Sequence, residues 1–197
     1  MKKLFYYDER TVMAAFEEAR EKRLPLLIDF WSPGCKGCKK MDDTTYKHPH
    51  VISYLQEHYI FVKYNSHNIQ PEFKNMYLTS PFLWTPTFMV YAPDGSEMRK
   101  VTGYLSPTHF LDELEMGRSM SFLRRAKSDE ALLILKQLIS ATRWHHIRQE
   151  AYYWAGVAAF YANRKSLEHL LPFWNALLDQ YPGTEWADRA DCLEVTV

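Results

Sequence analysis

The chain of 197 residues carries 24 lysines and arginines against 24 aspartates and glutamates, so its formal net charge is zero. Without excess positive charge it has no general attraction to nucleic acid or to an anionic membrane, and we expect neither partner. No apolar stretch reaches the length of a membrane-spanning helix, and the basic start at residues 1–3 is not followed by the apolar run of a secretory signal. We therefore expect a cytoplasmic protein, or a periplasmic one if a signal peptide has been removed.

The first half of the chain alternates between helical and strand patterns. Apolar residues at helical spacing predict helices over residues 11–23, 35–46, 51–58, 72–77 and 107–116. Apolar runs bounded by turn residues predict strands at 26–31, 60–64, 87–91 and 97–103. The Pro-Asp-Gly turn at 93–95 makes the last two strands an antiparallel hairpin. The order of elements predicts an α/β fold with a mixed central sheet flanked by helices.

Beyond about residue 117 the strand signals stop and only helical patterns follow. We expect helices over residues 129–142, 147–163, 167–181 and 185–193. The chain is therefore divided into a first domain at residues 1–117 and a small all-α extension at residues 118–197.

Two of the three cysteines, Cys35 and Cys38, are separated by two residues and follow directly on the buried strand expected at 26–31. This spacing lets both sulfurs reach bonding distance, and a helix beginning there places its positive dipole end beside the first thiol. Cys35 is therefore the predicted nucleophile. Cys38, one helical turn further in, is predicted to resolve the mixed disulfide that Cys35 forms.

The Cys35–Cys38 motif, together with residues 29–31, Thr85–Pro86 and Gly103, resembles the thioredoxin family over residues 5–116. It is most similar to the thioredoxin-like domains of bacterial thiol:disulfide interchange proteins. The resemblance implies the thioredoxin fold and an oxidoreductase with a redox-active disulfide that serves cell redox homeostasis. It implies no bound cofactor.

The resemblance also implies roles for residues around the cysteines. Asp29 corresponds to a buried carboxylate that exchanges a proton with the resolving cysteine, and Lys63 corresponds to the lysine that pairs with it. Pro86 is the expected cis-proline facing the cysteines, and Thr85 offers backbone groups to an extended substrate. Trp31 corresponds to an aromatic residue that shields the site. The residues themselves leave other readings open: a solvated strand end for Asp29, an exposed strand position for Lys63 and a core position for Trp31.

The sequence departs from the thioredoxin pattern in two places that bear on function. The dipeptide between the cysteines is Lys-Gly rather than Gly-Pro, and since this dipeptide tunes the reduction potential, the direction of electron flow stays open. The segment at residues 78–84, ahead of Pro86, is longer and more apolar than the family norm. We expect Phe82 and Trp84 to shape a partner-specific surface there, with Trp84 in contact with substrate.

Neither a metal site nor a role for the third cysteine is favoured. Two cysteines at this spacing form half of a zinc site, but no second pair exists, and the histidines of residues 48–67 lack finger-like spacing. We therefore assign no metal ligand. Cys192 is expected on the final helix as a small buried residue rather than as a redox group.

The stretch at residues 151–161, followed by residues 177–184, resembles a tetratricopeptide-type helical hairpin. Fewer than about three such repeats rarely stand alone, so we expect the extension to pack on the first domain or on itself in a homodimer. The favoured function is reduction of protein disulfide substrates, with electrons from a reductase or an upstream dithiol. The alternative is a binding adaptor in which the extension docks a partner and the thioredoxin unit is a scaffold.

Overall fold

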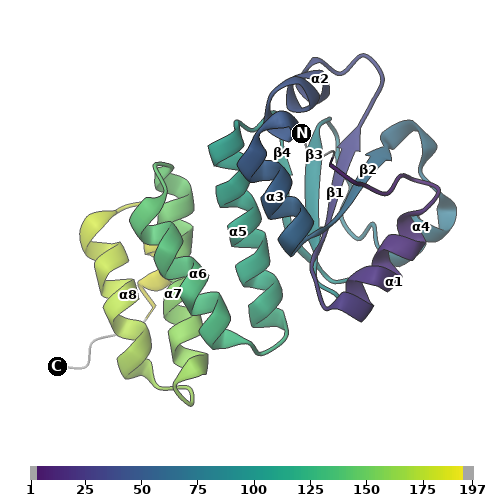
Figure 1. Ribbon diagram of the computed structural model, residues 1–197. Helices are drawn as coiled ribbons and strands as arrows, with labels where there is room; N and C mark the ends of the chain where they lie inside the picture. Colours follow the sequence, from purple (N-terminus) through teal and green to yellow (C-terminus); the bar gives the residue numbers. More distant parts are fainter. Residues whose placement is uncertain (1–3, 193–197) are drawn as a thin grey trace. The chain divides into compact units, whose positions relative to one another are not determined.

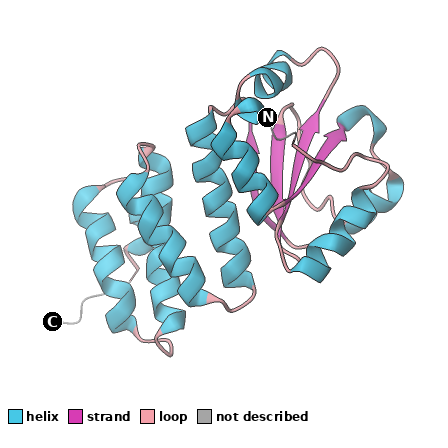
Figure 2. Ribbon diagram, in the orientation of Figure 1, coloured by secondary structure: helices cyan, strands magenta, loops and turns pink. Residues whose placement is uncertain are grey.

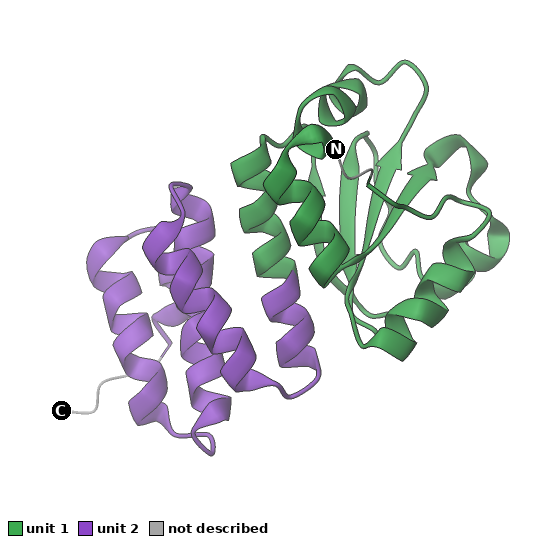
Figure 3. Ribbon diagram, viewed as in Figure 1, with its two compact units in different colours: residues 1–117 green, residues 118–197 purple. Residues whose placement is uncertain are grey.

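The computed structural model describes residues 4–192 and divides the chain into two compact units, residues 1–117 and 118–197 (Figure 3). Helix α5 (Pro107–Arg124) is continuous through this division, so it is longer than the helix expected at 107–116. Among the described helices, none combines the length and the apolar character needed to cross a bilayer.

The first unit is built on a four-stranded sheet with the strand order β2-β1-β3-β4 (Figure 1). The strands are β1 (Leu26–Trp31), β2 (Ile60–Asn65), β3 (Thr87–Tyr91) and β4 (Glu97–Thr102). Strands β1 and β2 are parallel, whereas β3 runs antiparallel to both β1 and β4. The crossover from β1 to β2 needs intervening helices, while the turn after Tyr91 brings β4 back beside β3. The sheet is therefore mixed, as the sequence predicts.

Helices cover both faces of this sheet (Figure 2). They are α1 (Val12–Lys22), α2 (Lys36–Asp43), α3 (Pro49–His58), α4 (Pro71–Met76) and the first part of α5, with short 3-10 helices η1 (Thr45–Lys47) and η2 (Ser66–Asn68). One buried cluster joins α1 and α4 to one face of the sheet, and a second joins α2, α3 and α5 to the other. The thioredoxin fold predicted for the first domain is confirmed.

Alternation along β1 decides which layer each of its side chains enters. Successive side chains on a strand point to opposite faces. Ile28 and Phe30 belong to the cluster on the α1 face, and Leu27 belongs to the cluster on the α2, α3 and α5 face. Asp29 has the same parity as Leu27, so its carboxylate enters the layer that holds α2 and Tyr46.

The second unit consists of helices that pack in sequence order. It contains the end of α5 and four whole helices, which are α6 (Ser128–Ala141), α7 (His145–Ala162), α8 (Leu167–Gln180) and α9 (Glu185–Ala190). Helix α6 packs on α7, α7 on α8, and α8 on α9. Gly156 of α7 lets the ring of Trp174 approach the helix backbone, and Trp174 stacks on Tyr153 at 5.0 Å between ring centroids. The fold class predicted for this region is confirmed, whereas its tetratricopeptide-type character stays a prediction.

The expectation for Cys192 is wrong. The final helix was expected to reach residue 193, but α9 ends at Ala190, and Cys192 lies exposed in the turn that follows. A residue beyond the last helical turn has no helix face on which to be buried. The expected end of the helix, at residue 193, lies outside the described residues.

Candidate active site

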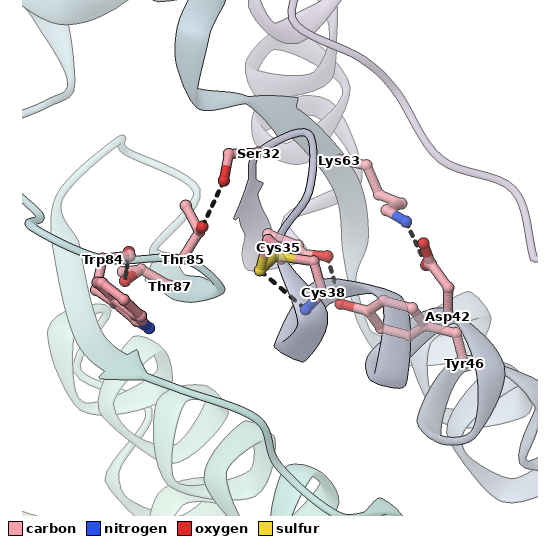
Figure 4. Close-up of a disulfide and its surroundings, with 10 residues drawn as sticks. Ser32, Cys35, Cys38, Asp42, Tyr46, Lys63, Trp84, Thr85 and Thr87 are labelled. Carbon is pink, nitrogen blue, oxygen red and sulfur yellow. Dashed lines mark hydrogen bonds and ion pairs between the residues drawn. A yellow bond between two sulfur atoms is a disulfide. The ribbon is translucent and has the colours of Figure 1, made fainter.

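A disulfide joins Cys35 and Cys38 at the start of α2 (Figure 4). Strand β1 ends at Trp31, and the following turn passes through Gly34, whose φ of +78° lies in the left-handed region that favours glycine. Cys35 is the N-cap of α2, and its sulfur accepts a hydrogen bond from the backbone N–H of Cys38 at 3.0 Å. The helix start therefore directs a backbone donor at the Cys35 sulfur.

The two cysteines differ in accessibility. Cys35 is half-buried and lines an open cleft, whereas Cys38 is only 7% exposed. Cys38 lies one helical turn before Met41, whose side chain belongs to the buried cluster between α2 and the sheet. Only one sulfur of the pair is therefore presented to an incoming molecule.

The segment Thr85–Pro86 lies directly opposite the cysteines and contains a cis peptide bond, as predicted. A Cβ atom on Gly37 would lie 2.9 Å from Cδ of Pro86, so glycine permits the close approach of the two segments. The hydroxyl groups of Ser32 and Thr85 are 2.7 Å apart and share a hydrogen bond (Figure 4). The backbone N–H of Gly103 donates to the carbonyl of Pro86 at 2.8 Å. These contacts fix the proline on the sheet beside the disulfide.

The cleft beside Cys35 has a volume of about 860 Å³. Its walls come from the turn before α2, from residues 66–69, from the segment 78–86 and from the start of the loop after β4. Trp84 and Thr85 line it together with Pro86, so three of the four residues expected to bind substrate border the same space as Cys35.

Trp31, the fourth, does not line the cleft. It is half-buried at the end of β1, beside Asn65 of the neighbouring strand. Its expected role as a shield of the site stays a prediction. Aromatic side chains that do border the cleft include Phe82, Trp84 and Tyr104.

Asp29 is buried beneath the sheet face that carries α2, and one of its oxygens accepts a hydrogen bond from the Tyr46 hydroxyl at 2.8 Å. The other carboxylate oxygen, Oδ1, is buried without a protein partner. Burial raises the pKa of Asp29 from 3.8 to about 6, although the charge of Lys63 and the Tyr46 hydrogen bond both lower it. The open reading of Asp29 as a solvated strand end is therefore wrong.

Lys63 forms its ion pair with Asp42, not with Asp29 (Figure 4). Asp29 and Lys63 are in register on neighbouring strands, so the expected proximity is present. The ammonium group turns instead toward the carboxylate on α2 and lies 5.3 Å from the ring centroid of Tyr46. Lys63 still acts on Asp29 through its charge, and Asp42 acts in the opposite direction by raising the pKa of Asp29.

Sequence reasoning missed Tyr46 and Asp42 as neighbours of Asp29. Tyr46 lies in η1 and is 7% exposed, in the same cluster as Leu27. A signal for it exists in the sequence, because a buried carboxylate needs donors and a tyrosine among apolar positions supplies one. The choice of Asp42 as the partner of Lys63 carries no such signal, since both carboxylates are compatible with the pattern.

Residues 12–118 match the family model described as a thioredoxin-like domain. The thiol:disulfide interchange protein DsbD of Campylobacter jejuni (strain RM1221) is 25% identical over 99 residues, which are 50% of this chain and 17% of that relative. The chain thus matches only a small part of the length of this relative.

Two of the solved structures that resemble this chain are the following. The oxidised C-terminal domain of Neisseria meningitidis DsbD is 24% identical, with a TM-score of 0.47 over 58% of this chain and 99% of that one. A thioredoxin from Thermus thermophilus is 22% identical, with a TM-score of 0.47 over 57% of this chain and 85% of that one. The family match covers more than half of the chain, including the Cys35–Cys38 disulfide, and the chain therefore belongs to the thioredoxin-like domain family.

Proposed function

We propose that the protein is a thiol:disulfide oxidoreductase that reduces disulfides of partner proteins. The Cys35 thiolate attacks one partner sulfur, a bond forms between the two sulfurs, and the second partner sulfur leaves as a thiolate. The Cys38 thiolate then attacks the Cys35 sulfur of this mixed disulfide. The Cys35–Cys38 bond forms and the partner leaves as a dithiol, so two electrons pass from the cysteine pair to the partner.

The observation that carries the proposal is the asymmetry of the disulfide. Cys35 lines the cleft at the start of α2, and Cys38 is buried behind it. A partner can therefore be attacked only by Cys35, while Cys38 is held where it meets the mixed disulfide from the protein side. Thr85, Pro86 and Trp84 would contact the partner chain, because they border the same cleft.

Asp29 is the proposed acceptor of the Cys38 proton. Cys38 is buried on α2, and Asp29 is buried on β1 and bonded to Tyr46. A carboxyl with a pKa of about 6 is largely ionised at neutral pH. A free carboxylate oxygen, Oδ1, is available in this buried layer. Lys63 would contribute by its charge rather than by contact, since its ion pair is with Asp42.

The direction of electron flow depends on the compartment and on the reduction potential of the pair. In a reducing cytoplasm a reductase or an upstream dithiol would keep the pair reduced, and the protein would act as a reductase. A potential near thioredoxin's value of about −270 mV supports this direction, whereas a value near about −120 mV would make the protein a disulfide donor in an oxidising compartment. Equilibration against glutathione, followed by alkylation of free thiols, measures this potential.

Trapping of mixed disulfides tests the assigned roles of the cysteines. All variants should carry Cys192→Ser, because the exposed Cys192 thiol would form adducts of its own. Cys38→Ser should accumulate mixed disulfides with partner proteins, since the second step is blocked, and Cys35→Ser should accumulate none. Equal trapping by both variants would contradict the assignment. If Cys35→Ser preserves the cellular role while removal of residues 118–197 abolishes it, the adaptor function is the correct one.

A further inference from the structure

The segment at residues 78–84 is anchored to the sheet at both of its ends. Ser80 donates to both carboxylate oxygens of Glu97 at 2.9 Å, and Thr79 donates to the same carboxylate at 3.1 Å. The ammonium group of Lys100 donates to the Ser80 hydroxyl at 3.0 Å and to the carbonyl of Pro81 at 2.9 Å. Strand β4 therefore holds the first half of the segment through two charged side chains.

The second half of the segment is anchored by apolar packing and by a backbone contact. The ring of Phe82 stacks on Phe30 of β1, with 4.4 Å between centroids. The hydroxyl of Thr87 donates to the carbonyl of Trp84 at 2.7 Å (Figure 4). Between these anchors Leu83 is 97% exposed and Trp84 is 71% exposed, and both line the cleft beside Cys35.

The backbone on both sides of Leu83 is bonded to the sheet, through the Pro81 carbonyl and through the Trp84 carbonyl. The Leu83 and Trp84 side chains are nevertheless exposed at the edge of the cleft. An exposed apolar patch beside a reactive group indicates a contact with a partner.

The ionisable side chains at the cleft are not acidic. Apart from Cys35, the ionisable residues among the described residues that line the cleft are Lys36, His67 and Tyr104. The same lining contains no aspartate or glutamate. The ammonium group of Lys40 lies 4.2 Å from the ring centroid of Tyr104, at the same side of the site. A cleft with fixed positive charge at its rim favours partners that carry negative charge there.

We propose that this cleft selects protein segments in which the reactive cysteine is flanked by a large apolar residue and by a carboxylate. The apolar residue packs on Leu83 and Trp84, and the carboxylate meets the positive rim formed by Lys36 and Lys40. The inference rests on the proposed exchange activity and specifies the class of substrate that the activity takes.

Synthetic peptides of about eight residues test the selection, each with one cysteine in a mixed disulfide with thionitrobenzoate. One peptide flanks the cysteine with leucine and glutamate, a second with leucine and lysine, and a third with serine and glutamate. The reduced Cys192→Ser protein attacks the peptide sulfur and releases the coloured thiolate, which gives the rate. The mixed disulfide of 2-mercaptoethanol with thionitrobenzoate serves as a small reference substrate that releases the same coloured thiolate, and each rate is expressed relative to it.

We expect the leucine and glutamate peptide to react about tenfold faster, relative to the reference, than either of the other two, a difference of about 1.4 kcal/mol. Leu83→Ser should remove the preference for leucine, and Lys36→Gln should remove the preference for glutamate. Matched controls are Leu133→Ser on α6, where the leucine is 61% exposed, and Lys74→Gln on α4. Neither control should alter the preferences.

Equal relative rates for the three peptides would overturn the selection while leaving the exchange activity in place. A preference that survives both Leu83→Ser and Lys36→Gln would overturn the assigned surface. Failure of every peptide and of the reference disulfide to react would instead refute the proposed function, so the two failures are distinguishable.

Discussion

Asp29→Asn is expected to stabilise the oxidised protein at neutral pH, because ionisation of Asp29 opposes folding. The folded protein raises the pKa of this carboxyl from 3.8 to about 6. A shift of one pKa unit corresponds to about 1.4 kcal/mol, so burying the ionised carboxylate lowers the free energy of unfolding by about 3 kcal/mol. The Tyr46 hydroxyl still has an acceptor in the asparagine amide, and the hydrogen bond found at 2.8 Å is preserved.

The sign of the effect follows from the raised pKa. Below pH 3.8 the carboxyl is protonated in both states, and the buried neutral form carries no charge penalty. Between pH 3.8 and about 6 the unfolded chain has lost the proton that the folded protein still holds, so wild-type stability declines over this range and levels off above it. The stability of the variant relative to wild type should therefore increase by about 3 kcal/mol between about pH 4 and about pH 7.5.

Urea titrations at several pH values measure this difference. NMR signals from β1 and β3 should be followed, because they report on the first unit alone. Asp94→Asn is the matched control: Asp94 is exposed, and its side chain accepts a hydrogen bond from the backbone of Ser96 at 3.0 Å, which asparagine also does. If the free energy of unfolding of Asp29→Asn relative to wild type is as independent of pH as that of Asp94→Asn, the reasoning is refuted. A difference that falls with rising pH would show that the fold favours the ionised carboxyl.

Three further changes have defined outcomes. Tyr46→Phe removes a hydrogen bond to the Asp29 carboxylate that is worth about 1.5–3 kcal/mol. The pKa of Asp29, followed by carboxyl NMR, should therefore rise by about one to two units, and an unchanged pKa contradicts this. Gly37→Ala places a methyl group 2.9 Å from Pro86 Cδ and should lower the free energy of unfolding by about 1–3 kcal/mol in urea titrations. Thiol–disulfide exchange should also be slower, and an unchanged stability and exchange rate contradict the tight contact. Gly156→Ala sets a methyl group 2.6 Å from the α8 tryptophan ring and should destabilise the second unit by about 1–3 kcal/mol, seen by fluorescence; a stabilised second unit contradicts it.

Much of the fold follows from local patterns in the sequence. The apolar run at residues 26–31 is a buried strand because each of its residues fits between two covered faces. The cysteine pair opens a helix because Gly34 ends the preceding turn and Cys35 has the position of an N-cap. These features depend on neighbours within a few residues, and such neighbours are visible in the sequence.

The contacts that tune the site depend on the folded arrangement instead. Tyr46 reaches Asp29 across 17 positions of sequence, and Lys63 selects Asp42 although Asp29 lies in register beside it. Pairing two buried charges costs desolvation of both, and Asp42 is half exposed whereas Asp29 is buried. The sequence pattern identifies both carboxylates but does not rank their burial. The same limit applies to Cys192, whose exposure is decided by where α9 ends.

The residues proposed for recognition and those proposed for proton transfer lie on different elements around the disulfide. Leu83 and Trp84 belong to the segment held by β4, on the cleft side of Cys35. Asp29 and Tyr46 are buried and hydrogen-bonded to each other on the sheet face that α2 covers. In the proposed reaction, the first group would therefore act on formation of the mixed disulfide in the cleft. The second group would act on its resolution, which requires the Cys38 proton to leave. Changes at Leu83 should consequently alter the first step, and changes at Tyr46 should alter the pH dependence of the second. Such a division would let the selection of partners change without altering the chemistry of the cysteine pair.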